Sequence, residues 1–308
     1  MAPDSSERGE GPLQLSWEND PRPLTPPAAI EATVRWEIAE DCDVVDSVAY
    51  LEMRARRALW DGERPSFSDI RLAKTSEDFA PIDDAREHVV PLAIEGSRRR
   101  GEHGDVPMSF ELPAAFPSVD DDYLTVCYGL VAVVVPAGSP AVTSRSDVRV
   151  LAVRSAGAAA ESSPDFGFGS GLQGGLIVVD DVRRHARIGD ALSGNVEVTP
   201  PPGAWTVEIS LLRVHMGHAL GGSTDAVVRK DHRLSTTGVI ELSAKSEIVP
   251  FSFPVPADAQ PTCLLPDGRL TYAVRVDIAP ASKLQRLTKG GGLDLEVNLY
   301  HVDDMGEE

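Results

Sequence analysis

Apolar and polar residues alternate with a period of two along several stretches of the chain. The alternation is clearest at 293–302 (LDLEVNLYHV) and recurs at 271–278 (TYAVRVDI). Because successive side chains of a β-strand point to opposite faces of a sheet, this pattern predicts half-buried strands. The stretch 124–135 (LTVCYGLVAVVV) is almost continuously apolar. It predicts a central strand that is covered on both faces.

Further stretches of the same kind are predicted as strands: ATVRWEI, SVAYLEM, DVRVLAV, GNVEV and TVEISLL. Residues 47–60 (SVAYLEMRARRALW) also fit an amphipathic helix, because Leu51, Ala55 and Leu59 are spaced four apart. Strand and helix both remain open there. With only 6% aromatic residues but 26 glycines and 24 prolines, the composition favours many short elements joined by turns. The sequence therefore predicts an all-β fold.

The chain of 308 residues is long enough for two domains of ordinary size. Residues 1–27 are charged and proline-rich, which predicts a mostly disordered tail. A second break at 155–174 is rich in glycine, alanine and serine and has the composition of a flexible linker. These breaks predict β-sandwich domains at 28–154 and 175–303, followed by a short acidic tail at 304–308.

The four tryptophans are spread along the chain. Trp17, within LQLSW, is the exception in the predicted tail. Such an aromatic segment either adds an edge strand to a domain or leaves the indole exposed. Trp36 and Trp205 lie in or beside strand patterns and are expected in the core. Because the tryptophans form no cluster, a carbohydrate-binding or hydrolytic β-sandwich is only the weaker alternative for function.

An internal repeat relates the two halves. The first half contains VPMSFELP, FPS and LTVCY in order over 106–128, and the second contains VPFSFPVP, QPT and LTY over 249–272. Phe110 and Phe253 take the same place in the repeat and are predicted to be buried equivalents. A proline then ends each strand, because it has no N–H to donate to a ladder. Duplication of one sandwich unit explains the repeat most simply.

This F-x-(L/V)-P, P-(S/T), L-T-(x)-Y signature resembles that of arrestin-like domains, which occur in pairs in arrestins, in retromer's arrestin-like subunit and in bacterial sporulation-control proteins. Residues 188–198 (IGDALSGNVEV) are also similar to an early strand pair of the family, with Gly189, Asp190 and Gly194 at the motif's positions. The first half lacks these glycines. The resemblance covers most of 28–303. It implies two tandem immunoglobulin-like β-sandwich domains in a bilobed arrestin-like arrangement.

We expect a non-enzymatic adaptor or scaffold that binds other proteins and needs no cofactor, because the sequence contains no catalytic constellation. In arrestins, an arginine on the last strand of the first domain belongs to a phosphate-sensing polar core. Arg149 and Arg154 lie on the corresponding strand here, and the resemblance implies an interdomain polar core at these two residues. A regulator that responds to an anion or a phosphopeptide is therefore the main alternative.

The formal net charge of −19 argues against binding nucleic acid or an anionic membrane over a broad face. Two basic clusters stand out against this background, and they comprise Arg98, Arg99, Arg100, Arg183, Arg184 and Arg187. Guanidinium groups bind phosphates and carboxylates through forked hydrogen bonds, so these clusters are candidate sites for acidic or phosphorylated partner segments. The alternative is exposed charge that only aids solubility.

Other chemistry-bearing residues carry weaker signals. His215 and His218 form an HxxH pair, but zinc needs three or four ligands, so a loop is the simpler interpretation. The acidic run 120–122 is predicted to be a solvated loop, with Ca²⁺ binding as the alternative. No motif of a hydrolase, metalloprotease or P-loop nucleotide-binding protein occurs. We therefore predict no enzyme, no metal site and no cofactor.

The three cysteines, Cys42, Cys127 and Cys263, lie far apart and form no CxxC pair, so no disulfide framework is expected. The N-terminal segment has no apolar h-region, and no run of about 18 apolar residues occurs. These features predict a cytoplasmic protein without a transmembrane segment.

Overall fold

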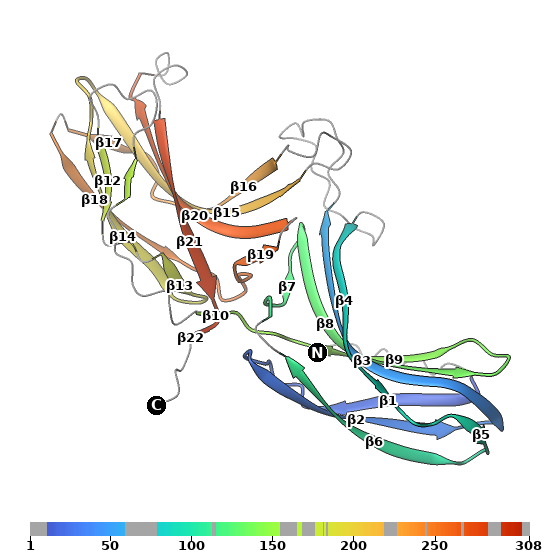
Figure 1. Ribbon diagram of the computed structural model, residues 1–308. Helices are drawn as coiled ribbons and strands as arrows, with labels where there is room; N and C mark the ends of the chain where they lie inside the picture. Colours follow the sequence, from blue (N-terminus) through green and yellow to red (C-terminus); the bar gives the residue numbers. More distant parts are fainter. Residues whose placement is uncertain are drawn as a thin grey trace. The chain divides into compact units, whose positions relative to one another are not determined.

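The computed structural model describes residues 11–58, 79–112, 115–154, 165–167, 176–180, 182, 184–218, 227–243, 245–265, 268–282 and 291–303. Over these residues the fold is all-β, with several mainly antiparallel sheets and no helix, which confirms the all-β part of the predicted fold class (Figure 1). The chain divides into two compact units. The described residues of unit 1 lie within Met1–Arg56, Ala80–Ser118 and Thr125–Leu151, and those of unit 2 lie within Arg57–Phe79, Val119–Leu124 and Ala152–Glu308.

The smaller sheet of unit 1 has the strand order β1-β2-β6, formed by Leu13–Asn19, Ala28–Ile38 and His103–Leu112. The larger sheet has the order β4-β3-β8-β7, and β5 pairs with β3 while β9 pairs with β8. Its strands are β3 (Cys42–Ala58), β4 (Phe79–Pro91), β5 (Gly96–Arg98), β7 (Val119–Asp120), β8 (Leu124–Pro136) and β9 (Val142–Val148). Within this sheet, β7 and the residues up to Leu124 belong to unit 2. Residues 128–132 of β8 are all buried, which confirms the predicted central strand.

Residues 47–58 form part of β3, so the structure decides for the strand over the helix in this segment. The spacing of Leu51 and Ala55 also suits a helix, but β3 has a neighbouring strand on either side. Ladder hydrogen bonds to β4 and β8 therefore override the local helical pattern. Residues 59 and 60 lie outside the described residues.

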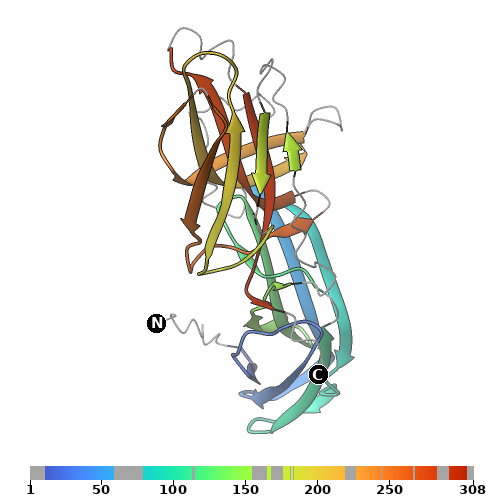
Figure 2. The same ribbon diagram turned by 90° about the vertical axis from the view of Figure 1, so that its left-hand side faces the viewer.

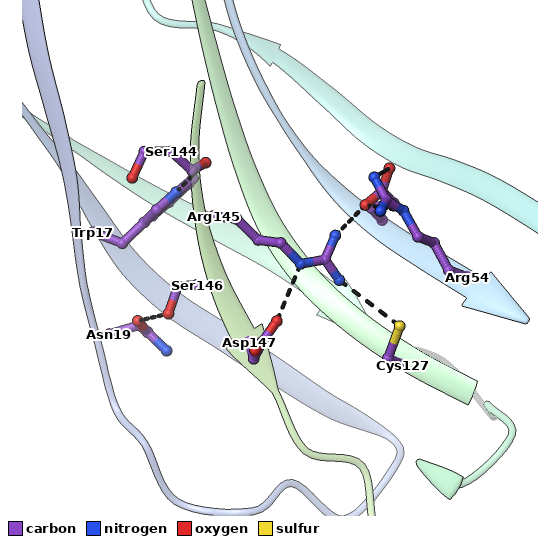
Figure 3. Close-up of polar contacts among 9 residues, drawn as sticks. Trp17, Asn19, Arg54, Cys127, Ser144, Arg145, Ser146 and Asp147 are labelled. Atoms are coloured by element: carbon purple, nitrogen blue, oxygen red, sulfur yellow. Dashed lines mark hydrogen bonds and ion pairs between the residues drawn. The ribbon is translucent and has the colours of Figure 1, made fainter. Parts of the chain in front are cut away.

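Leu13–Asn19 form β1, which pairs antiparallel with β2 along its whole length. The structure differs here from the disorder predicted for residues 1–27 and confirms the alternative of an added edge strand. Leu13 is only 1% exposed, and the indole N–H of Trp17 donates to the carbonyl of Ser144 at 3.2 Å (Figure 3). Alternating apolar residues thus anchor this segment despite the charges around it.

The described residues of unit 2 form two large sheets and one two-stranded sheet. One large sheet has the order β11-β12-β14-β18, formed by Asp165–Gly167, Leu176–Asp180, Ala191–Thr199 and Glu247–Pro254. The other has the order β13-β21-β20-β15-β16, with β17 on β15 and β19 on β20. Its strands are His185–Arg187 (β13), Trp205–His218 (β15), Val227–Thr236 (β16), Ile240–Leu242 (β17), Cys263–Leu265 (β19), Gly268–Pro280 (β20) and Gly291–Tyr300 (β21). The short strands β10 (Val153–Arg154) and β22 (Val302–Asp303) pair in parallel.

The two large sheets of unit 2 enclose one hydrophobic core. Val196 and Phe253 reach it from one sheet, and Ile209 and Val276 reach it from the other. Figures 1 and 2 show the two sheets as separate layers. Unit 2 is thus a two-layered, sandwich-like body whose interior is built by the alternating apolar residues of its strands.

Two glycines of the 188–198 motif meet specific backbone requirements. Gly189 lies in a turn with φ of +93°, a conformation that residues with a Cβ rarely adopt. At Gly194 in β14, a Cβ would lie 2.4 Å from Cγ2 of Val182. The first glycine permits the turn that leads into β14, and the second permits Val182 to pack directly against that strand.

The two units repeat one strand order. Eight consecutive strands, β2 to β9, have the same order along the chain and the same neighbours as the eight strands β14 to β21. In both sets the first strand pairs with the fifth, and the seventh lies between the second and the eighth. The internal repeat in the sequence therefore corresponds to a repeat in topology.

The repeated tyrosines make equivalent hydrogen bonds. The hydroxyl of Tyr128 donates to the carbonyl of Phe116 at 2.8 Å, and that of Tyr272 donates to the carbonyl of Gln260 at 2.7 Å. Each carbonyl belongs to the residue 12 positions earlier, directly before the proline of the P-(S/T) pair. These bonds are similar to the tyrosine corners of other β-sandwiches, which fix the chain where it crosses between sheets.

The Ser or Thr after that proline connects the same crossing to a later segment of its own unit. The amide of Val150 donates to the Ser118 hydroxyl at 2.9 Å, and the amide of Leu299 in β21 donates to the Thr262 hydroxyl at 2.9 Å. The amides of Ser118 and Thr262 in turn donate to the carbonyls of Val150 and Leu299. Each P-(S/T) pair therefore has a defined structural role in its unit.

Removing one hydroxyl tests these tyrosine bonds. We expect Tyr128→Phe and Tyr272→Phe each to lower the free energy of unfolding by about 0.5–1.5 kcal/mol, because one intramolecular hydrogen bond is lost while the ring stays in place. Denaturant titration of each variant measures the loss. Wild-type stability in both variants would show that the bonds do not hold the crossings.

Candidate functional site

The side chain of Arg98, which is predicted to bind an anion, contacts other residues of unit 1. Its Nε–H donates to the carbonyl of Ile94 at 2.9 Å, and its guanidinium lies 5.5 Å from the ring centre of Trp36. The carboxylate of Glu102 lies 3.6 Å from Nη1. These contacts place Arg98 at the base of the loop, where it stabilises the β5–β6 connection.

Arg99 and Arg100 lie at the tip of the same loop with exposed side chains. The amide of Arg100 donates to the carboxylate of Asp41 at 2.7 Å, and Gly101 turns the chain with φ of +84°. The loop is thus fixed through its backbone, while two of its three guanidinium groups face solvent.

The second basic cluster is described only in part. Arg183 lies outside the described residues. The carbonyl of Arg184 accepts the amide of Asn298 at 2.7 Å, and Nε–H of Arg187 donates to the carbonyl of His301 at 3.2 Å. Arg184 therefore contributes a backbone bond to β21, and the side chain of Arg187 binds the residue that directly follows β21.

Arg149 and Arg154 belong to different units. Arg149 is exposed, and its carbonyl accepts the amide of Leu24 at 2.8 Å. The guanidinium of Arg154 lies 6.0 Å from the ring centre of Tyr300. The interdomain polar core implied for these arginines stays a prediction.

Unit 1 contains a polar cluster around Glu52 of β3, whose side chain is buried. Figure 3 shows Arg54, Arg145, Asp147 and Cys127 of this cluster. Its carboxylate pairs with Nε of Arg54 at 2.8 Å and with the guanidinium of Arg145 from β9. Arg145 also donates to Asp147 at 3.0 Å, and its Nη2 lies 3.9 Å from Sγ of Cys127. The buried carboxylate is thus paired with two guanidinium groups.

The approach of Arg145 to β8 depends on Gly129. A Cβ at that position would lie 2.6 Å from Cζ of Arg145, so any larger residue would displace the guanidinium. Burial lowers the pKa of Arg145, but its bonds to Asp147 and Glu52 outweigh burial and raise the pKa above its usual value. Arg145 therefore stays charged and compensates the buried carboxylate of Glu52.

A second and more deeply buried cluster lies in unit 2. Asp121, between β7 and β8, accepts from Nη1 of Arg213 at 2.7 Å, and its other oxygen lies 2.7 Å from Nε2 of His215. Both arginine and histidine extend from β15. The side chain of Asp121 is 1% exposed and that of His215 is 2% exposed. The amide of Tyr123 adds a third bond to the carboxylate at 3.1 Å.

The structure corrects two predictions at this cluster. Residues 120–122 were expected to be a solvated loop, yet Asp121 is buried because Arg213 and His215 replace its water. His215 was expected in a loop after a strand, yet β15 continues through it to His218. Among the described residues, no group of three or more metal-ligating side chains is present.

Aromatic and basic groups surround the buried ion pair. The ring of Tyr123 lies 4.4 Å from that of His215 and 5.4 Å from that of His232, measured between centroids. Nζ of Lys230 donates to the Tyr123 hydroxyl and lies 4.5 Å from the centre of the ring. Burial lowers the pKa of Lys230 to about 8. Burial, followed by the charge of Arg213, also lowers the pKa of His232.

The cluster borders a cleft of about 260 Å³ in unit 2. Its lining is mainly polar and consists of Asp120, Asp121, Asp122, Arg213, Leu234, Pro256, Asp258, Ala259, Gln260 and Tyr272. The residues come from β7 and the segment between β7 and β8, from β15, β16 and β20, and from the loop after β18. This cleft and the buried ion pair form the candidate functional site.

Comparison with protein-family models gave no match to the chain, and comparison with curated protein sequences gave none either. The class of protein is therefore defined by the structure, as an all-β protein of two compact units. Within the described part of the chain, no helix is long and apolar enough to cross a membrane.

Proposed function

We propose that the chain is a non-enzymatic adaptor built from two tandem immunoglobulin-like sandwiches of the arrestin-like kind, and that it binds other proteins. The observation that carries this proposal is the repeat of eight strands with the same order and pairing in both units. The matched bonds of Tyr128 and Tyr272 support a duplicated sandwich module. Fold alone does not decide activity, and the adaptor function is proposed by analogy with other proteins of this architecture.

The sheet edges influence how a partner can bind. β6 and β18 end their sheets, and each carries a proline at the same place in the repeat, Pro107 and Pro250. Proline has no N–H to offer, and it protects an exposed edge from added strands. A partner is therefore expected to bind through loops and clefts rather than by extending the sheet at these two edges.

Affinity capture with the full-length protein tests the adaptor function. The tagged chain is recovered from its native cell, co-purifying proteins are identified by mass spectrometry, and each is then mixed with the pure chain in a calorimeter. We expect at least one protein to bind at a fixed stoichiometry. The proposal fails if no purified candidate binds and the chain instead converts a small molecule.

The exposed arginines favour a second function, a regulator that responds to an anionic or phosphorylated segment. Because Arg98 is occupied by Ile94, Trp36 and Glu102, only Arg99 and Arg100 offer free guanidinium groups in this loop. Such groups form charge-assisted bonds to phosphate.

Separate substitutions in this loop distinguish the structural role of Arg98 from anion binding by Arg99 and Arg100. We expect the double variant Arg99→Ala/Arg100→Ala to change stability by less than about 0.5 kcal/mol, because exposed charges contribute little to folding. Arg98→Ala should cost about 1–2 kcal/mol, because its hydrogen bond and its contact with Trp36 are lost. Thermal melting measures both effects, and phosphopeptide titration measures binding. Equal phosphopeptide affinity in the wild type and the double variant would contradict the regulatory function.

A further inference from the structure

Four basic side chains share one face of β15 and β16. In the antiparallel ladder between these strands, Arg213 lies opposite His232, and His215 lies opposite Lys230. Residues that are directly opposite share a face of a sheet, and so do residues two apart along a strand. Among the described residues, one buried carboxylate binds this basic face. It belongs to Asp121, and Arg213 and His215 already occupy its two oxygens.

The chain from β7 to the start of β8, residues 119–124, packs over this basic face and is called the β7 segment below. Besides the buried carboxylate, it contributes the ring of Tyr123, which is only 5% exposed. The ring centre lies 4.4 Å from that of His215 and 5.4 Å from that of His232. The hydroxyl accepts from Nζ of Lys230. These contacts all join the β7 segment to β15 or β16, so the position of the segment depends on the charge state of the basic face.

The two histidine rings have no acceptor for an additional proton. An ionised carboxylate only accepts, so Nε2 of His215 donates to Asp121. Nδ1 of the same ring is buried, and Nε2 of His232 is buried as well. Neither nitrogen has a partner in the described part of the chain. An imidazolium carries N–H on both nitrogens, so protonation of either ring in place would leave a buried donor unsatisfied.

Burial and charge have the same effect on His232. Burial lowers the pKa of this ring, and the three other basic residues of the face lower it further, while Asp121 raises it. The remaining acidic group nearby is Asp122, which is exposed and acts on Lys230. A histidine in water has a pKa of about 6.5. The stability that neutral His232 gives to the closed arrangement is therefore complete above about pH 6.5, and it is lost as the pH falls toward the lowered pKa.

We propose that proton uptake by His232 releases the β7 segment from β15 and β16, so that mildly acidic pH changes the conformation of unit 2. The new charge would repel Arg213 and Lys230, and movement of the Tyr123 ring would let water reach the imidazolium. Residues 120–122 also line the cleft, so the release would change the shape of the cleft. The inference is independent of the proposed adaptor function.

Hydrogen exchange of the full chain tests the release, at about pH 7.5 and about pH 5.5, on either side of the ordinary histidine pKa. The reporters are the amides of the β7 segment, among them that of Tyr123, which donates to Asp121 at 3.1 Å. Each rate is divided by the intrinsic exchange rate at the same pH. We expect protection to fall by about 5–10-fold at the lower pH, because about 10-fold is the limit one pH unit below an open-form pKa of about 6.5.

Substitution of His232 assigns the effect to one ring. In His232→Gln the side chain is neutral at both pH values, so the protection of the β7 segment should change by less than about 2-fold between them. The matched control is His103→Gln, which removes an exposed histidine of unit 1 and should keep the pH dependence of the wild type. Amides of β14, such as that of Val196 in the core, should change by less than about 2-fold in every protein, because a local release does not open the core.

A titration of the wild-type ring followed by NMR gives a second test that needs no substitution. The midpoint for His232 should lie below the ordinary value of about 6.5. A midpoint at or above that value would overturn the inference. Equal protection of the β7 segment at both pH values would also overturn it, as would an unchanged pH dependence in His232→Gln. An equal loss of protection in β14 would show unfolding of the whole unit instead of a local release.

Discussion

Replacing Asp121 with alanine is expected to lower the free energy of unfolding of unit 2 by about 3–5 kcal/mol. The substitution leaves Arg213 and the buried ring of His215 without the carboxylate that now lies 2.7 Å from each. Removing one member of a buried pair costs more than the pair contributes, because the remaining polar groups stay out of water. Chemical denaturation monitored by tryptophan fluorescence, with Trp205 in unit 2, measures the loss.

The adjacent aspartate provides the control. Asp122 is exposed, so Asp122→Ala should change stability by less than about 0.5 kcal/mol. Both variants remove a carboxylate, at adjacent positions. The two carboxylates differ mainly in burial. If Asp121→Ala unfolds like Asp122→Ala, the buried ion pair does not hold the segment between β7 and β8.

The same carboxyl gives the stability a defined pH dependence. Burial raises the pKa of Asp121, but the hydrogen bond and charge of His215, followed by the charge of Arg213, outweigh it and lower the pKa below its ordinary value of 3.8. The unfolded chain therefore takes up this proton first as the pH falls. The contribution of Asp121 is complete above about pH 4 and is lost as the pH falls through the lowered pKa. Asp121→Ala should show a shallower loss of stability below pH 4 than the wild type.

Truncation of the repeated phenylalanines is expected to have an effect of similar size in each unit. Phe110 is 0% exposed and Phe253 is 2% exposed, so the prediction that both are buried is confirmed. Phe110→Ala and Phe253→Ala should each cost about 3–5 kcal/mol, through lost burial and the cavity left behind. Phe116, which is half-exposed, serves as the control, and Phe116→Ala should cost clearly less.

Thermal melting of the full chain separates the two core variants. Each substitution should lower the melting transition of its own unit, since Phe110 lies in unit 1 and Phe253 in unit 2. Wild-type melting in either variant would contradict the equivalence of these residues in the repeat.

Local patterns in the sequence were sufficient to predict much of the fold. Alternation predicted β20 and β21, and the continuous apolar run predicted the buried middle of β8. These predictions hold because the period-two pattern reports directly which side of a strand faces a core. The equivalence of Tyr128 and Tyr272 could also be predicted from the sequence. Each tyrosine bonds to a residue only 12 positions away, so both partners lie within the repeated motif.

The candidate site was much less predictable. Asp121 is separated from Arg213 by 92 positions and from His215 by 94, and no local pattern connects them. The sequence could show an acidic run and an HxxH pair, but it could not show that one carboxylate of the run is buried. The arginines were found by composition, yet whether each is free depends on neighbours such as Ile94 and Trp36 that only the fold supplies.

The sequence by itself determined that this protein is all-β and that one pattern of strands, prolines and tyrosines occurs twice, because these features depend on neighbouring residues along the chain. Only the tertiary structure decided that residues 47–58 are a strand, that Trp17 lies in an edge strand, and that Asp121 is buried. Each of these outcomes depends on a partner in another segment. Residues 47–58 pair with β8, the strand of Trp17 pairs with β2, and Asp121 is bound by residues of β15. Hydrogen bonds and charge pairs between segments that are distant in the sequence form only as the chain folds, so a local sequence pattern does not report them.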